Sequence, residues 1–187
     1  MLIAKAKRQE NIIEYLLYMY QVEDIIRSFQ FNMDMINQAV VEKFDQPEAV
    51  KSEIRSWYEE LSQQMQEQGL KRKGHLKFLR DLIAELQDLH DQLSTTFFDK
   101  QYIDLYDAAK PYLKELTVKS VGQSLSNQID VAVHGVYGFL MLRLKKQEIS
   151  SETEKAMEKI TGFLAYLAAC FHKKEAGLLN LSKVQGN

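Results

Sequence analysis

The opening of the chain, from Lys5 to Phe29, has the apolar spacing of a long helix. Its apolar residues lie around nearly the whole circumference of that helix. A helix that is apolar on all sides must pack among other helices rather than lie on a surface. The pattern therefore predicts a buried N-terminal helix.

Further stretches with helical spacing follow to the end of the chain. The expected helices are 36–44, 47–69, 76–97, 99–116, 125–146 and 151–177. Asp45 and Asp99 are predicted N-caps, and Ser151 with Glu154 forms a predicted capping box. Pro111 lies inside its helical pattern and predicts a kink or a break there.

No stretch shows the alternation of a strand. The sequence therefore predicts an all-α fold, a single bundle of six to seven mostly antiparallel helices around the N-terminal one. We expect one domain over residues 1–180 and a disordered tail over 181–187.

Composition fits an ordinary globular protein, with 45% apolar and 27% charged residues among 187 and a formal net charge of −2. Cys170 is the single cysteine, which excludes an internal disulfide and favours a reducing compartment. The longest uncharged apolar stretches have 12 residues, whereas a membrane-spanning helix needs about 20. We therefore expect a cytoplasmic protein that does not enter a membrane.

A charged pair interrupts the apolar surface of the first predicted helix. Glu23 lies among the directions of apolar side chains, and Arg27 follows one turn later. A carboxylate there is costly unless it is paired, and Arg27 is the expected partner. The pair is either a structural ion pair or a polar centre in a cavity where a ligand could replace one partner.

Three polar residues share one face of the helix predicted over 125–146. Asp130, His134 and Tyr137 have the spacing and chemistry of a general acid/base site, because a carboxylate can orient an imidazole. A half-buried structural histidine is the alternative. Gly135 and Gly138 in the same helix predict close approach of another helix.

The remaining candidates point to structure or surface. His90 lies in the leucine pattern of 76–97 and is expected in the core or at an interface, and His172 with Glu175 does not suffice for a metal site. We expect no metal and no cofactor. The basic cluster Lys71-Arg72-Lys73 lies between helices, as surface charge does, and we do not expect nucleic-acid binding.

The segment KRQENIIEYLLYMYQVEDIIR near the N-terminus resembles an uncharacterised bacterial family that is catalogued only as a domain of unknown function, and Gln128 to Ser150 resembles it as well. The resemblance implies an all-helical bacterial protein. It transfers no catalytic or binding residue.

Two functions are consistent with these patterns. The first is a non-enzymatic helical protein that acts by self-association or by binding a protein partner. The second is a small-molecule-binding protein or an unrecognised enzyme with a polar pocket around Glu23, Arg27, Asp130, His134 and Tyr137. The sequence favours the first.

Overall fold

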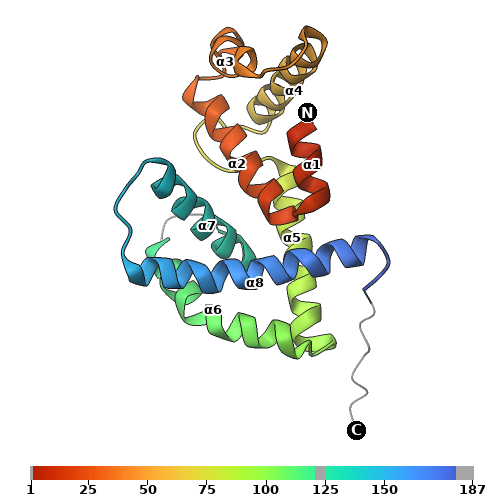
Figure 1. The fold of residues 1–187 in the computed structure, drawn as a ribbon, viewed down its shortest axis with the longest axis vertical. Coiled ribbons are helices and arrows are strands. Elements are labelled where there is room, and N and C mark those ends of the chain that lie inside the picture. Colours follow the sequence, from red (N-terminus) through yellow and green to blue (C-terminus); the bar gives the residue numbers. More distant parts are fainter. Residues whose placement is uncertain (1, 121–124, 180–187) are drawn as a thin grey trace. The chain divides into compact units, whose positions relative to one another are not determined.

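The computed structural model describes residues 2–120 and 125–179 (Figure 1). These residues form eight α-helices and no strand, so the all-α prediction is confirmed and the helix number is slightly higher than expected. The helices are α1 Leu2–Glu10, α2 Ile12–Ser28, α3 Met33–Ala39, α4 Glu48–Glu67, α5 Lys77–Asp91, α6 Lys100–Lys119, α7 Gln128–Leu144 and α8 Ser151–Glu175. A 3₁₀ segment, η1 Val41–Lys43, precedes α4, and a π-helical segment, η2 Gln92–Thr96, extends α5. The tail expected over residues 181–187 lies outside the described residues.

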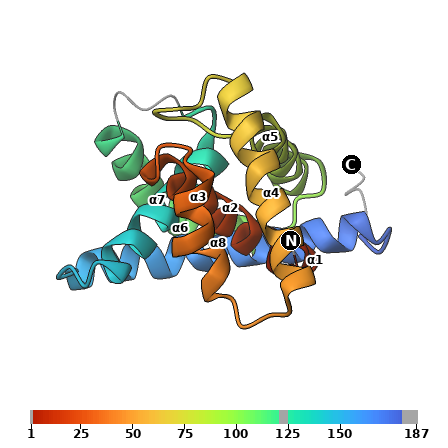
Figure 2. The same cartoon turned by 90° about the horizontal axis from the view of Figure 1, so that it is seen from above.

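The chain divides into two compact units. Unit 1 holds the residues up to Glu10 and Glu14–Asp81, and unit 2 holds Asn11–Ile13 and the residues from Leu82 on. In unit 1, α3 packs beside α4, as Figures 1 and 2 both show. In unit 2, α6, α7 and α8 pack against one another. The expectation of one domain stays a prediction.

The predicted N-terminal helix is divided at Asn11. The Asn11 side chain accepts a hydrogen bond from the Ile13 backbone N–H at 2.9 Å, which makes Asn11 the start of a new helix. Most of the long apolar helix is α2, and its buried residues include Ile12, Leu16, Met19, Tyr20, Val22 and Ile26. The prediction of a buried N-terminal helix therefore describes α2.

Helix boundaries elsewhere follow the predicted signals with small shifts. Asp99 caps α6 by accepting from the Tyr102 N–H at 3.0 Å, as predicted. Asp45 is not the N-cap of α4. Pro47 is the N-cap, and the helix begins at Glu48. The cap of α8 is Ser150 rather than Ser151, because the Ser150 hydroxyl accepts from the Thr153 N–H. Helix α6 continues through Pro111 without a break.

The leucine pattern over α5 and η2 is a core face. Phe97, at the end of the pattern, is half-buried. The buried members are Leu76, Leu79, Ile83, Leu86, His90 and Leu93. Gly135 allows α7 to approach α6, because a Cβ at this position would lie 2.5 Å from Leu116 Cδ1. Nothing lies within 4 Å of a Cβ at Gly138, so close packing explains only the first of these two glycines.

Candidate functional site

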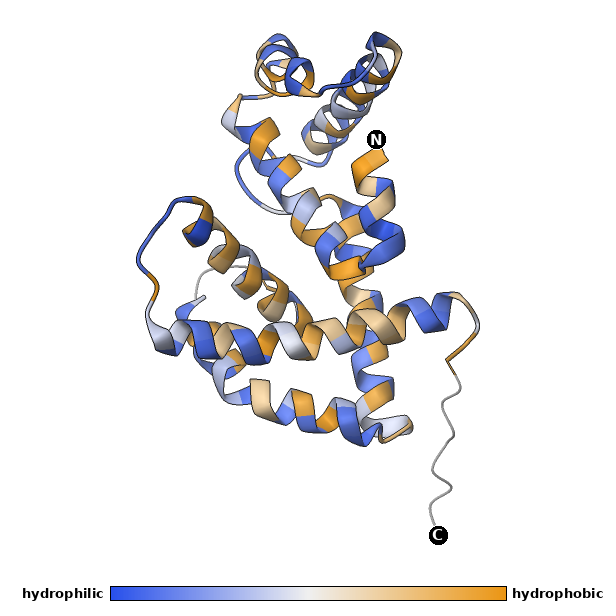
Figure 3. Ribbon diagram, viewed as in Figure 1, coloured by the Kyte–Doolittle hydropathy of each residue, from blue (hydrophilic) through white to orange (hydrophobic). Residues whose placement is uncertain are grey.

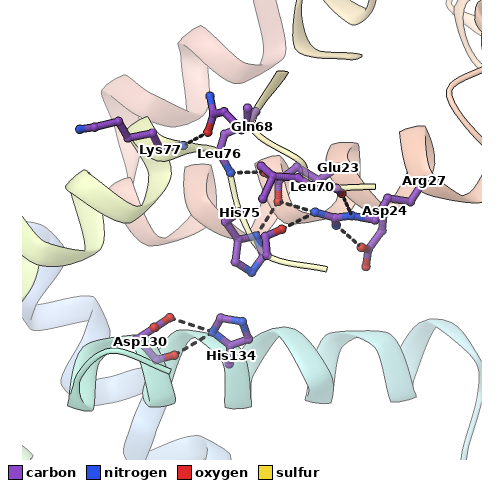
Figure 4. A network of polar contacts seen from close by, with 11 residues as sticks. Glu23, Asp24, Arg27, Gln68, Leu70, His75, Leu76, Lys77, Asp130 and His134 are labelled. Carbon is purple, nitrogen blue, oxygen red and sulfur yellow. Dashed lines mark hydrogen bonds and ion pairs between the residues drawn. The ribbon is translucent and has the colours of Figure 1, made fainter. Parts of the chain in front are cut away.

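The carboxylate of Glu23 is fully buried in unit 1 and holds the beginning of α5 (Figure 4). Its Oε1 accepts from the backbone N–H of Leu76 at 2.8 Å, and its Oε2 lies 2.5 Å from Nδ1 of His75. The first N–H groups of a helix have no partner inside the helix, and a negative charge is favoured near them. Glu23 therefore supplies a cap to α5 from another helix.

His75 is fixed on two sides by residues of α2. Its ring stacks on Tyr20 with a centroid distance of 3.7 Å and an interplanar angle of 18°, while Nδ1 faces Glu23. Its side chain is 18% exposed. A carboxylate that accepts from one ring nitrogen sets the orientation and the tautomer of the imidazole.

Arg27 ties the loop between α4 and α5 to α2. Its Nε donates to the Leu70 carbonyl at 3.1 Å, and its guanidinium also donates to the Gly74 carbonyl and to Asp24. The predicted pair with Glu23 is present but longer, at 3.8 Å. The nearest partners of Glu23 are thus His75 and Leu76, and Arg27 mainly fixes the loop.

Sequence reasoning missed His75, although one signal for it exists. The residues directly before α5, Gly74, His75 and Leu76, include no Ser, Thr, Asp or Asn that could cap the helix. A helix start without its own cap needs an acceptor from elsewhere, and Glu23 is a buried carboxylate that needs donors. The Gln68 side chain supplies a second acceptor, to the Lys77 N–H at 2.8 Å.

The predicted pair of α7 forms as well. Asp130 Oδ1 lies 3.0 Å from Nδ1 of His134, and Asp130 Oδ2 accepts from the Ser126 backbone N–H at 2.8 Å and from its hydroxyl at 3.0 Å. Burial raises the pKa of Asp130, but the hydrogen bonds from His134 and Ser126 outweigh burial and leave the pKa below its ordinary value. Asp130 therefore stabilises the first turn of α7 as an ionised group.

The five residues predicted for one polar pocket fall into two sets. Glu23 and Arg27 belong to unit 1, and Asp130, His134 and Tyr137 belong to unit 2. Each set contains a buried carboxylate with an imidazole beside it. Whether the five residues form one site stays a prediction.

His90 lies in a buried aromatic cluster of unit 2, as expected of a core histidine. It is 5% exposed, and its Nδ1 is 2.7 Å from the Tyr102 hydroxyl. The rings of Tyr106 and Phe163 also contact the imidazole. Burial lowers the pKa of His90, so the imidazole is neutral in the folded protein near pH 7.

The described residues contain neither a candidate metal-binding cluster nor a candidate membrane-spanning helix. Residues 2–120 and 125–179 contain no group of three His, Cys, Asp or Glu side chains placed to hold a metal ion. No helix in the same ranges is both long and apolar enough to cross a membrane.

No curated protein and no protein of solved structure matches this chain. A family model described as "Domain of unknown function (DUF4924)" matches residues 1–178, which is nearly the whole sequence. The capped α5 start, α2 with its buried Glu23, and the apolar α7 all lie inside the matched range. The chain thus belongs to the DUF4924 family.

Proposed function

We propose that the protein is a non-enzymatic, cytoplasmic interaction protein that associates with a second copy of itself through the C-terminal end of α7. One observation carries the proposal. Leu142 and Leu144, at the end of an almost wholly apolar helix, are 42% and 62% exposed.

The exposure changes along α7. Its first half is buried, with Ile129, Ala132 and Val133 fully covered. In its second half, Phe139, Leu140 and Met141 are only half-buried, although Figure 3 shows the helix mostly in the hydrophobic colours. A helix that is apolar on all sides is usually surrounded. An apolar surface left at its end is typical of an interaction site.

The rim of this surface suits a two-fold contact between identical chains. Arg143 and Glu154 lie 3.8 Å apart and are both more than half exposed, and Arg143 also lies over the Phe139 ring at 4.4 Å. In a two-fold contact the same surface of both chains is buried, so α7 of one chain packs against α7 or the adjoining start of α8 of the other. Arg143 of one chain can then pair with Glu154 of the other while the leucines are buried between them.

The cytoplasmic location is supported by the cysteine. Cys170 is a buried free thiol, and burial raises its pKa, which keeps it protonated and unreactive. A single protected thiol suits a reducing compartment.

Light scattering coupled to size-exclusion chromatography tests the proposal. The wild type should have the mass of a dimer at micromolar concentration, and Leu142→Glu/Leu144→Glu should have the mass of a monomer with unchanged helical circular dichroism. Val118→Glu is the matched control, because Val118 is 72% exposed on α6 in the same unit. A monomeric wild type, or a dimer that survives the double substitution, contradicts the proposal.

A second function, small-molecule binding or an unrecognised enzymatic activity, is favoured by the Glu23–His75 pair. A fully buried carboxylate beside an imidazole is an arrangement that active sites use. Native mass spectrometry of gently purified protein is its test. A reproducible extra mass that is lost in Glu23→Gln supports it, and a bare mass in both proteins contradicts it.

A further inference from the structure

We propose that unit 1 binds a small organic anion, a phosphate or carboxylate carried on a planar group, in a pocket between the end of α2 and the loop after α4. The pocket has a volume of about 270 Å³ and is lined by Arg27, Gln30, Phe31, Gln66 and Lys71. All of its lining residues belong to the same unit. The inference is independent of self-association through α7.

The positive charge in the pocket is held in place before any ligand arrives. Arg27 is 13% exposed at its side chain, and its contacts with Leu70, Gly74 and Asp24 leave it one orientation. A cation fixed in advance costs little to order on binding. Asp24 at 2.9 Å and Glu23 at 3.8 Å offset the charge of Arg27, so the net attraction for an anion comes mainly from Lys71, while Arg27 supplies fixed geometry.

The loop beside the pocket carries three positively charged side chains that form no ion pair within the described residues. Lys71, Arg72 and Lys73 are exposed, and they form no hydrogen bond or ion pair with any residue of the described ranges. The acidic groups nearby are engaged, because Asp24 pairs with Arg27 and Glu23 is occupied by His75 and Leu76. The loop therefore presents an excess of positive charge, with Lys71 at the pocket wall.

The shape of the pocket calls for a planar or apolar part as well as an anionic one. Gln30 and Phe31 both have left-handed backbones, with φ of 53° and 64°, a conformation that is strained for residues other than glycine. This conformation leaves Phe31 half-buried at the pocket wall. Its ring offers a surface for stacking, and the Gln30 and Gln66 amides can both donate and accept hydrogen bonds.

The volume favours a small ligand over a polymer. Pockets that enclose drug-sized molecules hold roughly 300–1,000 Å³, and this pocket lies just below that range. A single ring with one phosphate or carboxylate group fits such a space. Its charged end would face Lys71 and Arg27, and its ring would face Phe31.

Isothermal titration of the full chain with phenyl phosphate and with inorganic phosphate tests the inference. Phenyl phosphate should bind at least fivefold more tightly than inorganic phosphate, and Lys71→Gln should weaken it at least fivefold. Lys155→Gln is the control, since it makes the same charge change at an exposed position of α8 and should leave binding unchanged. Amide chemical shifts of residues 27–31 and 66–71 should move during the titration.

Three results of the titrations would overturn the inference. They are the absence of binding by phenyl phosphate, equal affinity for both phosphates, and equal weakening by Lys71→Gln and Lys155→Gln. Tight, salt-sensitive binding of single-stranded DNA without binding of phenyl phosphate would also overturn it, because the loop would then serve a polyanion.

Discussion

Glu23 and Asp130 are two buried carboxylates on apolar helices, and the protein accommodates them in different ways. Glu23 finds its partners far along the chain, in His75 and Leu76, which are 52 and 53 positions away. Asp130 finds its partners within four positions, in Ser126 and His134. The first arrangement is tertiary and the second is local.

The difference determines what each carboxylate holds together. Glu23 joins α2 to the beginning of α5, and Arg27 also attaches the loop between α4 and α5 to α2. Asp130 secures only the first turn of α7, where Asn127 already caps the Asp130 N–H. The fold of unit 1 should therefore depend on Glu23 more than the fold of unit 2 depends on Asp130.

The largest expected effect is that of Glu23→Ala. The substitution removes the Glu23 carboxylate that accepts from the fully buried Leu76 N–H and faces the His75 ring. Loss of one partner from a buried charged network costs roughly 3 kcal/mol. Urea denaturation followed by circular dichroism should show this decrease in the free energy of unfolding.

Two further variants separate the contribution of the hydrogen bond from the Leu76 N–H from that of the contact with the His75 imidazole. Glu23→Gln keeps an oxygen for the Leu76 N–H and should cost about half as much. His75→Phe keeps a ring against Tyr20 but removes the nitrogen that faces Glu23. If all three variants were as stable as the wild type, the tertiary role of Glu23 would be wrong.

The next effect in size is that of Asp130→Ala. The substitution removes the acceptor of the two Ser126 donors, and loss of a side-chain cap costs about 1 kcal/mol. Hydrogen exchange should rise at the first turn of α7 and remain unchanged at the start of α5. A loss as large as that of Glu23→Ala would remove the distinction between the two carboxylates.

The same distinction explains what the sequence could predict. The Asp130–His134 pair lies at a fixed helical spacing, so helical geometry alone brings the two side chains within reach. Asp99 as the cap of α6 is also a local pattern, and this prediction is confirmed. All-α architecture follows from such patterns summed along the chain.

The nearest partners of Glu23 could not be predicted from the sequence, because they do not lie at a helical spacing from it. Helical spacing offered Arg27, which is present at 3.8 Å, but the closer donors come from a loop whose position depends on packing. The division at Asn11 was missed because a side-chain cap competes with an otherwise continuous helical pattern. The pocket beside Arg27 depends on two left-handed residues, Gln30 and Phe31, that no spacing rule predicts.

The smallest expected effect is a pH dependence of the Asp130 contribution. Burial raises the pKa of Asp130, but hydrogen bonds from His134 and Ser126 bring it below the ordinary 3.8. A carboxylate whose pKa is lower in the folded protein binds fewer protons there than in the unfolded chain. Its contribution to stability is therefore present above about pH 4 and is lost as the pH falls through the folded pKa.

Asp130→Asn isolates this contribution, because the amide does not titrate. The difference in unfolding free energy between wild type and Asp130→Asn should narrow as the pH falls from about 5 toward about 3. His90, whose pKa is lowered by burial, destabilises both proteins below its ordinary 6.5 and so cancels in the difference. A difference that stays constant to acid pH would mean that the charge of Asp130 contributes nothing. Asp130 would then contribute to stability through its hydrogen bonds alone and not through its negative charge.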